Sequence, residues 1–316
     1  MDALQITLFG QVTVVHPQRS APLKLSHSSQ AILAFLLLRP HFVQREILLD
    51  VFWMNIPPDR ARSSLATALW RLRQLLEPDD VRPGTYLIAS NTGEVGFNWE
   101  SRHWLDAEEF EQPIHLLLRK PTSELDEDDI ARIEALLTLY RGEFLEGIYE
   151  DWALRERERF RMLHLNCLTR LMEFHASRGN FAQSIGYGHE ILRRDPLREE
   201  IQRSLMRLYL ESGQRSLAIR QYARCCELLN QELGVPPLEE TQALYRQIMT
   251  VARVGTPTAP IQPTSADLTQ LLRELQTVKQ NIDEAARTLA RVQAAVSQFA
   301  NIPLNGPSGD GAVMQK

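Results

Sequence analysis

The sequence predicts a mainly helical protein that opens with a small region of mixed strands and helices. Three observations lead to this fold class. Two-residue alternation of apolar side chains is confined to the first 26 residues and to a short stretch near residue 90. Helical spacing dominates from about residue 106 to residue 251. An unbroken three-and-four spacing then runs from residue 268 to residue 299 and predicts a coiled-coil helix.

Length and composition limit the class of protein. The chain has 316 residues, 44% of them hydrophobic, which suffices for two or three globular domains. No leader pattern opens the sequence, and the longest apolar run, residues 31–38, is too short to span a membrane. Cys167, Cys225 and Cys226 lack metal-binding spacing, so we expect reduced and mostly buried thiols. We therefore expect a cytoplasmic, nucleoid-associated protein that does not bind membranes.

The first hundred residues contain signals for strands, three helices and a hairpin, in that order. We expect strands at residues 4–8, 12–14 and 23–25. We expect a helix that is capped by Ser28 or Ser29, carries the apolar residues of 32–37 and stops near Pro40, then helices at residues 44–53 and 59–77. A hairpin should pair residues 86–88 with residues 95–97. This order is typical of a winged helix-turn-helix with an added N-terminal sheet, over residues 1–104.

The third helix is the candidate DNA-reading element. Its leucines, Leu65, Leu69, Leu72 and Leu76, form a buried stripe, and the opposite face is polar. The net charge of −5 weighs against nucleic-acid binding, but four of the nine cations in residues 1–100 lie between residues 60 and 73 without an acid among them. Arginine, glutamine and threonine can contact base edges, and serine or arginine can contact phosphate. The predicted DNA-binding residues are Arg60, Ser63, Thr67, Trp70, Arg71, Arg73 and Gln74.

Two alternatives stay open for this helix. Its polar face is also what an ordinary amphipathic helix presents to water. Trp70 can stack on a sugar or simply cover the neighbouring loop.

An internal repeat organises the helical region, residues 105–251. Leu171 and Leu205, Gly179 and Gly213, and Ser184 and Ala218 are each 34 residues apart, the period of tetratricopeptide repeats. The glycines should mark the turn inside each helix pair, and the small residues should allow close packing. Two repeats are too few to bury their own faces. Flanking helices are therefore expected around residues 133–145, 152–165 and 239–249.

The C-terminal part is predicted to be a linker at residues 252–265, a coiled-coil helix at 266–300 and a disordered tail at 301–316. With Leu268 at a heptad a position, Glu274 and Lys279 fall at g and e, which favours a parallel homodimer. The alternative is an amphipathic helix that folds back on the repeats. The predicted oligomerisation residues are Leu268, Leu271, Leu275, Val278, Ile282, Leu289, Val292, Val296 and Phe299.

No catalytic pattern is present. The sequence lacks phosphate-loop, zinc-protease, nucleophile-elbow and dinucleotide-binding signatures. The histidines are scattered, and a lone helical residue such as His175 is expected to be a packing or surface residue. The acidic run of residues 124–129 is interpreted as the solvated first turn of a helix rather than a cation site. We predict no enzyme activity, no metal and no cofactor.

Motifs in order along about residues 3–250 resemble the SARP-type activators (antibiotic regulatory proteins). These combine a winged helix of the response-regulator output type with a bacterial transcriptional activator domain. The motifs that carry the resemblance occupy residues 4–10, 45–48, 57–62, 68–73, 104–106, 139–145, 151–157, 194–200, 232–235, 237 and 240–241. The resemblance implies an activator that binds double-stranded DNA at promoter repeats through the third helix and the wing, and that contacts RNA polymerase.

The wing departs from this pattern, since Asn91, Thr92, Gly93 and Glu94 give its tip little positive charge. This weakens the expectation that the wing grips phosphate. The rival hypothesis is an interaction scaffold, in which the repeats bind partner proteins and the winged helix does not bind DNA.

Overall fold

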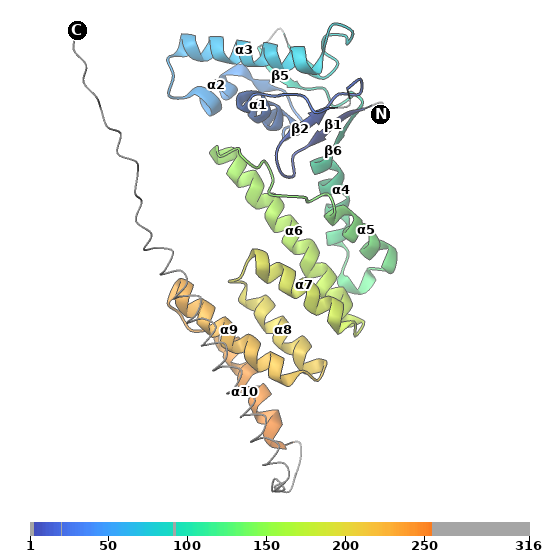
Figure 1. Cartoon of the computed structure of the whole chain (residues 1–316), viewed down its shortest axis with the longest axis vertical. Coiled ribbons are helices and arrows are strands. Elements are labelled where there is room, and N and C mark those ends of the chain that lie inside the picture. The colour runs from blue at the N-terminus through green and yellow to red at the C-terminus, as the bar shows by residue number, and fades with distance from the viewer. Residues whose placement is uncertain (1–2, 20, 91–92, 255–316) are drawn as a thin grey trace, which may run out of the picture. The chain divides into compact units, whose positions relative to one another are not determined.

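The computed structural model describes residues 3–19, 21–90 and 93–254, and it begins with a three-stranded sheet (Figure 1). Strand β1 (Leu4–Thr7) pairs antiparallel with β2 (Thr13–Val15) and parallel with β6 (His103–Leu105). The predicted strands at residues 4–8 and 12–14 are thus confirmed with small shifts. The predicted strand at residues 23–25 is wrong. Leu23 donates one backbone hydrogen bond to Val14, but the Leu25 amide turns back to the Leu23 carbonyl, so no ladder continues.

Helix α1 (His27–Leu37) is buried along most of its length. Its N-cap is Ser26, whose hydroxyl accepts the Ser29 amide, and not Ser28 or Ser29 as predicted. Those two serines already lie in the first turn, where their own amides need a cap. The difference moves the start of α1 two or three residues toward the N-terminus and leaves its apolar core as the sequence predicted.

Helices α2 (Arg45–Trp53) and α3 (Pro58–Leu76) confirm the two helices predicted next. Strands β4 (Leu87–Ala89) and β5 (Glu94–Phe97) form the predicted antiparallel hairpin, shifted by about one residue. A short strand that the sequence did not indicate, β3 (Val43–Gln44), pairs with β5, which gives a second sheet of order β3-β5-β4.

The helical region starts with α4 (Asp106–Arg119), a 3-10 turn (Thr122–Glu124) and α5 (Glu127–Leu137). The acidic run is the capped start of α5, as predicted: Asp126 accepts the Asp129 amide. The helix expected at residues 133–145 ends at Leu137, so that expectation is wrong beyond this point. Residues 143–146 instead bond to residues 8–11, which holds the segment out of helical conformation.

The repeat appears as successive helix pairs (Figure 1). Helix α6 (Asp151–Ser177) packs on α7 (Phe181–Arg194), and α8 (Glu199–Glu211) packs on α9 (Arg215–Leu233). Gly179 and Gly213 lie in the turn of each pair with φ of 73° and 77°, a region that favours glycine. The helix predicted at residues 152–165 is the first part of α6, and the one at 239–249 lies within α10 (Glu239–Val254).

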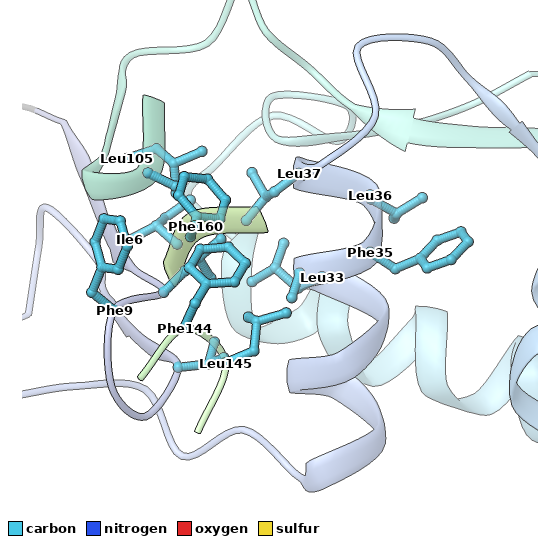
Figure 2. Packing of buried hydrophobic residues seen from close by; sticks show 14 of the residues in the cluster. Ile6, Phe9, Leu33, Phe35, Leu36, Leu37, Leu105, Phe144, Leu145 and Phe160 are labelled. Atoms are coloured by element: carbon cyan, nitrogen blue, oxygen red, sulfur yellow. The ribbon is translucent and has the colours of Figure 1, made fainter. Parts of the chain in front are cut away.

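A shared apolar core joins the N-terminal sheet to the helical region. The Phe9 ring lies 5.3 Å from Phe110, 5.5 Å from Phe144 and 5.4 Å from Phe160, between ring centroids. Figure 2 shows the rings of Phe9, Phe144 and Phe160 beside Ile6, Leu33 and Leu105. The buried Asp106 carboxylate accepts the Leu8 amide at 2.8 Å and the Phe9 amide at 3.0 Å. The first turn of α4 is thereby tied to the end of β1.

Helix α10 runs to Val254, so residues 252–254 are helical and not linker as predicted. The rest of the predicted linker, the coiled-coil residues and the tail lie outside the described residues. Within the described helices, none is both long enough and apolar enough to cross a bilayer. Cys167 and Cys225 are buried, and burial raises the pKa of each thiol to about 12. All three cysteines are free, in agreement with the prediction of reduced and mostly buried thiols.

Candidate nucleic-acid interface

Helix α3 is placed by a stripe of small and branched apolar residues. Pro58 occupies the first turn of α3. Backbone amides in the first turn have no acceptor within the helix, so the missing N–H of proline costs no hydrogen bond there. The buried residues are Ala61, Leu65, Ala68, Leu72 and Leu76. Leu69, which was predicted to be buried, is only half-buried, and Ala68 takes its place in the core. The buried face is therefore rotated slightly from the one that the leucines alone indicate.

The opposite face of α3 exposes six of the seven predicted DNA-binding residues. Trp70 is 62% exposed. Arg60, Arg71 and Gln74 form no side-chain hydrogen bond or ion pair within the described part of the chain. The Thr67 hydroxyl donates to the Ser63 carbonyl at 2.8 Å, and the residue is exposed. These side chains are available to a ligand.

Arg73 has a different environment. Its Nη2 donates to the Leu87 carbonyl at 2.9 Å, and its Nε lies 3.4 Å from the Glu77 carboxylate. Glu77 is buried and accepts the amides of Gly84, Tyr86 and Leu87 at 2.8–3.0 Å. Together they fasten the hairpin to the end of α3, so Arg73 positions the hairpin.

The sequence analysis did not identify Glu77 as a functional residue. The available signal was an acid at the C-terminal end of a helix, where the helix dipole disfavours it. Such a residue needs compensating donors, and the loop before β4 supplies them as backbone amides.

Two grooves flank the exposed face of α3. The first, of about 610 Å³, is bordered by α2, α3 and the hairpin, and includes Trp70 and Arg73. The second, of about 420 Å³, is bordered by the start of α1, the end of α2 and α3, and includes Ser63, Thr67 and Arg71. The predicted residues are thus divided between two sides of one helix, and Arg60 and Gln74 line neither groove.

The first groove contains two arginines that were not predicted. Arg45 opens α2, and Arg62 lies one turn into α3. Arg62 lies 3.5 Å from Asp59, but both side chains are strongly exposed, so the pair contributes little. These cations widen the basic surface toward the hairpin. The signal in the sequence was the spacing Arg60-x-Arg62, of which only the first member was selected.

The site contains no arrangement for metal chemistry. Among residues 3–19, 21–90 and 93–254, no group of three or more His, Cys, Asp or Glu side chains is placed to hold an ion. What the described surface offers is an exposed helix with hydrogen-bonding and cationic side chains beside a hairpin. Such a surface can contact base edges and phosphates.

Comparisons with known proteins give one matching family model and several similar regulators. A model of the bacterial transcriptional activator domain matches residues 105–249. The regulatory protein AfsR of Streptomyces griseus is 29% identical over 252 residues, which cover 78% of this chain and 25% of that protein. The transcriptional regulatory protein MoaR1 of Mycobacterium tuberculosis is 27% identical over 258 residues, which cover 78% of this chain and 79% of that protein.

A solved structure shares the fold. That of Mycobacterium tuberculosis EmbR in complex with a low affinity phosphopeptide aligns with a TM-score of 0.67 and 20% identity. The alignment covers 89% of this chain and 72% of the other. At this identity the likeness concerns the fold alone.

These findings confirm the resemblance to the SARP-type transcriptional activators. The part of the chain that matches the bacterial transcriptional activator domain is residues 105–249. It spans about a quarter of the length of the AfsR relatives, at 25% and 24% of the two proteins. The activity and partners of the full-length relatives do not by themselves apply to this chain.

Proposed function

We propose that the chain is a sequence-specific DNA-binding transcription regulator. Residues 1–104 would form a winged helix-turn-helix whose helix α3 enters the major groove, and residues 105–251 would form the activator domain. The observation that carries the proposal is the exposed face of α3, where Arg60, Arg71 and Gln74 have no partner within the described residues. Arginine and glutamine contact guanine and adenine edges in this setting.

We propose that base contacts and phosphate contacts come from different residues around α3. Arg71 and Gln74, with Ser63 and Thr67, lie on the face that points away from the core. Arg45 and Arg62 border the groove toward the hairpin, where a phosphate backbone would pass. Gln44 donates to Glu94 of the hairpin at 3.0 Å, so the hairpin adds an acid rather than a cation there. We propose that α3 supplies most of the affinity.

Pairing of two copies would compensate for this modest basic surface. We propose a homodimer through residues 266–300, with Leu268, Leu271 and the further heptad residues in its seam. Linking two weak modules raises the apparent affinity through effective concentration. Sedimentation of the full chain against a version ending at Gly255 tests this part. A dimer that becomes a monomer on truncation supports the pairing, and a full-length monomer contradicts it.

The resemblance further implies activation through contact with RNA polymerase, and we include this in the proposal. A reconstituted transcription assay with the source polymerase tests it. Added protein should increase transcript from a promoter that contains the bound site. An unchanged or reduced transcript would show a regulator that does not activate.

The central experiment measures DNA affinity after substitution of the exposed face. Fragments of the source genome that bind the full chain are selected, and their affinity is measured by fluorescence anisotropy. Arg71→Ala should lower affinity roughly tenfold, the effect of losing one bidentate base contact. Arg207→Ala is the matched control, because Arg207 is exposed on α8 and lies outside both grooves. Unchanged binding by Arg71→Ala would refute the assigned face.

The rival function is an interaction scaffold whose repeats bind partner proteins. Salt dependence separates the two, since phosphate contacts release counterions and make affinity fall steeply as salt rises. A DNA affinity that is weak and the same for every sequence would favour the scaffold. A steep salt dependence combined with preference for selected fragments favours the regulator.

A further inference from the structure

A third pocket, which we call the cavity, lies away from α3 in the region that matches the activator domain. It has a volume of about 640 Å³, within the range of small-molecule sites. Its walls are the segment between α5 and α6, the first half of α6 and the end of α7 (Figure 1). The lining residues are Tyr140, Arg141, Gly142, Glu143, Leu154, Arg157, Glu158, Arg161, His164 and Arg194. Four arginines and two glutamates give this lining a positive balance.

The arginines of this cavity differ in how much bonding capacity they have left. Arg161 pairs with Glu158 and Asp195, and Arg194 pairs with Glu190. Arg157 uses its Nε and Nη2 on the carbonyls of residues 144, 145 and 148, which leaves its Nη1. Arg141 is exposed and makes no hydrogen bond or ion pair within the described residues. Arg141 and Arg157 thus retain donors for a bound anion.

Among the described residues that line the cavity, His164 is the one polar residue that is itself buried. It is 4% exposed, and its imidazole makes no hydrogen bond within the described part of the chain. Its ring lies against Tyr140 with centroids 4.2 Å apart, and the Tyr140 hydroxyl is also without a partner among those residues. Both side chains line the cavity, and Tyr140 is half-buried. Each therefore has unused hydrogen-bonding capacity that a ligand in the cavity can take up.

Burial, with a smaller effect of nearby charges, explains the protonation state of His164. Burial, and then the nearby Arg194, lower the pKa of His164 to about 4, while Glu190 acts in the opposite direction. Glu158, Arg157 and Arg161 on α6 also line the cavity. The imidazole is therefore neutral at pH 7 and offers one donor and one acceptor. A bound anion would favour its protonated form.

We propose that this cavity binds a small organic anion. Its phosphate or carboxylate group would lie among Arg141, Arg157 and His164, and its remaining part would lie beside Tyr140 and Leu154. The binding stands apart from DNA recognition. A change in DNA affinity on anion binding is a separate consequence, and only that consequence rests on the proposed function.

The wall of the cavity is also the connection to the N-terminal sheet. The Glu143 carbonyl accepts the Gly10 amide at 2.9 Å, and the Leu145 amide donates to the Leu8 carbonyl at 2.8 Å. Gly142 lies so close to Gly10 that an added Cβ would come within 3.1 Å of the Gly10 Cα. An anion that orders residues 141–143 therefore stabilises the contact with the region that contains α3.

Histidine NMR of the full chain tests the site with sodium phosphate and sodium citrate as separate probes. The His164 signal, assigned through His164→Gln, should shift and saturate at millimolar probe, and its pKa should rise above about 4. Sodium chloride at equal ionic strength is the control. Saturation with phosphate identifies a phosphate ligand, and saturation with citrate a carboxylate ligand. No saturation beyond the chloride control with either probe overturns the proposal.

Two variants separate a built site from general charge attraction. Arg141→Ala should weaken binding roughly tenfold by removing a charge-assisted hydrogen bond. Arg207→Ala, which removes an equal charge on α8, should leave binding unchanged. Equal weakening by both variants overturns the proposal.

Hydrogen exchange measures the coupling to the N-terminal sheet. The Gly10 amide should exchange more slowly with saturating probe than without it, because its acceptor, Glu143, lies in the ordered wall. An unchanged rate despite binding overturns the coupling. Neither measurement uses DNA, so failure of the proposed function would leave both results interpretable.

Discussion

The protein uses arginine in opposite ways in two of its helices. On α3, Arg60 and Arg71 are exposed and have no partner within the described residues. On α6, Arg157 is mostly buried and donates to three backbone carbonyls. The first kind of arginine contributes little to folding and is available for binding. The second kind donates hydrogen bonds to backbone carbonyls of the segment before α6 and so contributes to folding.

Arg157→Ala gives the largest expected difference between the two kinds of arginine. The change leaves the carbonyls of Phe144, Leu145 and Ile148 without their donor in a largely buried place. We expect the free energy of unfolding to fall by about 3 kcal/mol, given the cost of unpaired buried groups. Urea denaturation followed by circular dichroism measures it. A loss as small as that of the exposed-site control Arg207→Ala would remove the distinction between the two helices.

Acid should act on the same region through His164. Its pKa of about 4 in the folded protein lies below the ordinary 6.5, so folding favours the neutral imidazole. The stability that it contributes is complete above pH 6.5 and is lost as the pH falls from 6.5 toward 4. The full loss is about 3 kcal/mol, from the size of the pKa shift.

Urea denaturation at a series of pH values checks this expectation, with His164→Gln for comparison. The variant should lose less stability than the wild type over this interval. Parallel curves for the two proteins would show that His164 does not govern the acid response.

A smaller effect is expected at Arg73, which belongs to α3 but behaves like the arginines of α6. Arg73→Ala removes the bond to the Leu87 carbonyl and the ion pair with Glu77. We expect a loss of about 1.5 kcal/mol in the free energy of unfolding, the scale of one charge-assisted hydrogen bond. Faster amide exchange in β4 and β5 should accompany it. A free energy of unfolding equal to that of Arg71→Ala would show that Arg73 contributes no more to stability than an exposed arginine.

The smallest effect on stability is expected at Arg62. Its pair with Asp59 is exposed on both sides, so Arg62→Ala should change the free energy of unfolding by less than about 0.5 kcal/mol. Its effect should appear in DNA binding instead. If Arg62 contacts a phosphate, the slope of log affinity against log salt should decrease by about 1. An unchanged slope would assign the phosphate contacts elsewhere.

The sequence predicted the elements of the candidate interface from local pattern. Leucine spacing indicated the buried side of α3, and the polar residues opposite are exposed as expected. The prediction missed the rotation that buries Ala68 in place of Leu69, because it weighed leucines and ignored a small residue that fits a close contact. It also grouped Arg73 with the exposed residues, since nothing in the spacing shows the Leu87 carbonyl or the Glu77 carboxylate.

Periodicity by itself thus determined which residues become helices, which face of each helix is apolar and where Gly179 and Gly213 turn the repeat. The tertiary structure alone decided the pairing of β6 with β1, the end of α5 at Leu137 and the fastening of residues 143–146 to residues 8–11. The physical reason is range. Helical burial repeats every three or four residues and is visible in a short window. A backbone amide or carbonyl far along the chain leaves no trace in the local sequence, although it decides which conformation a segment adopts.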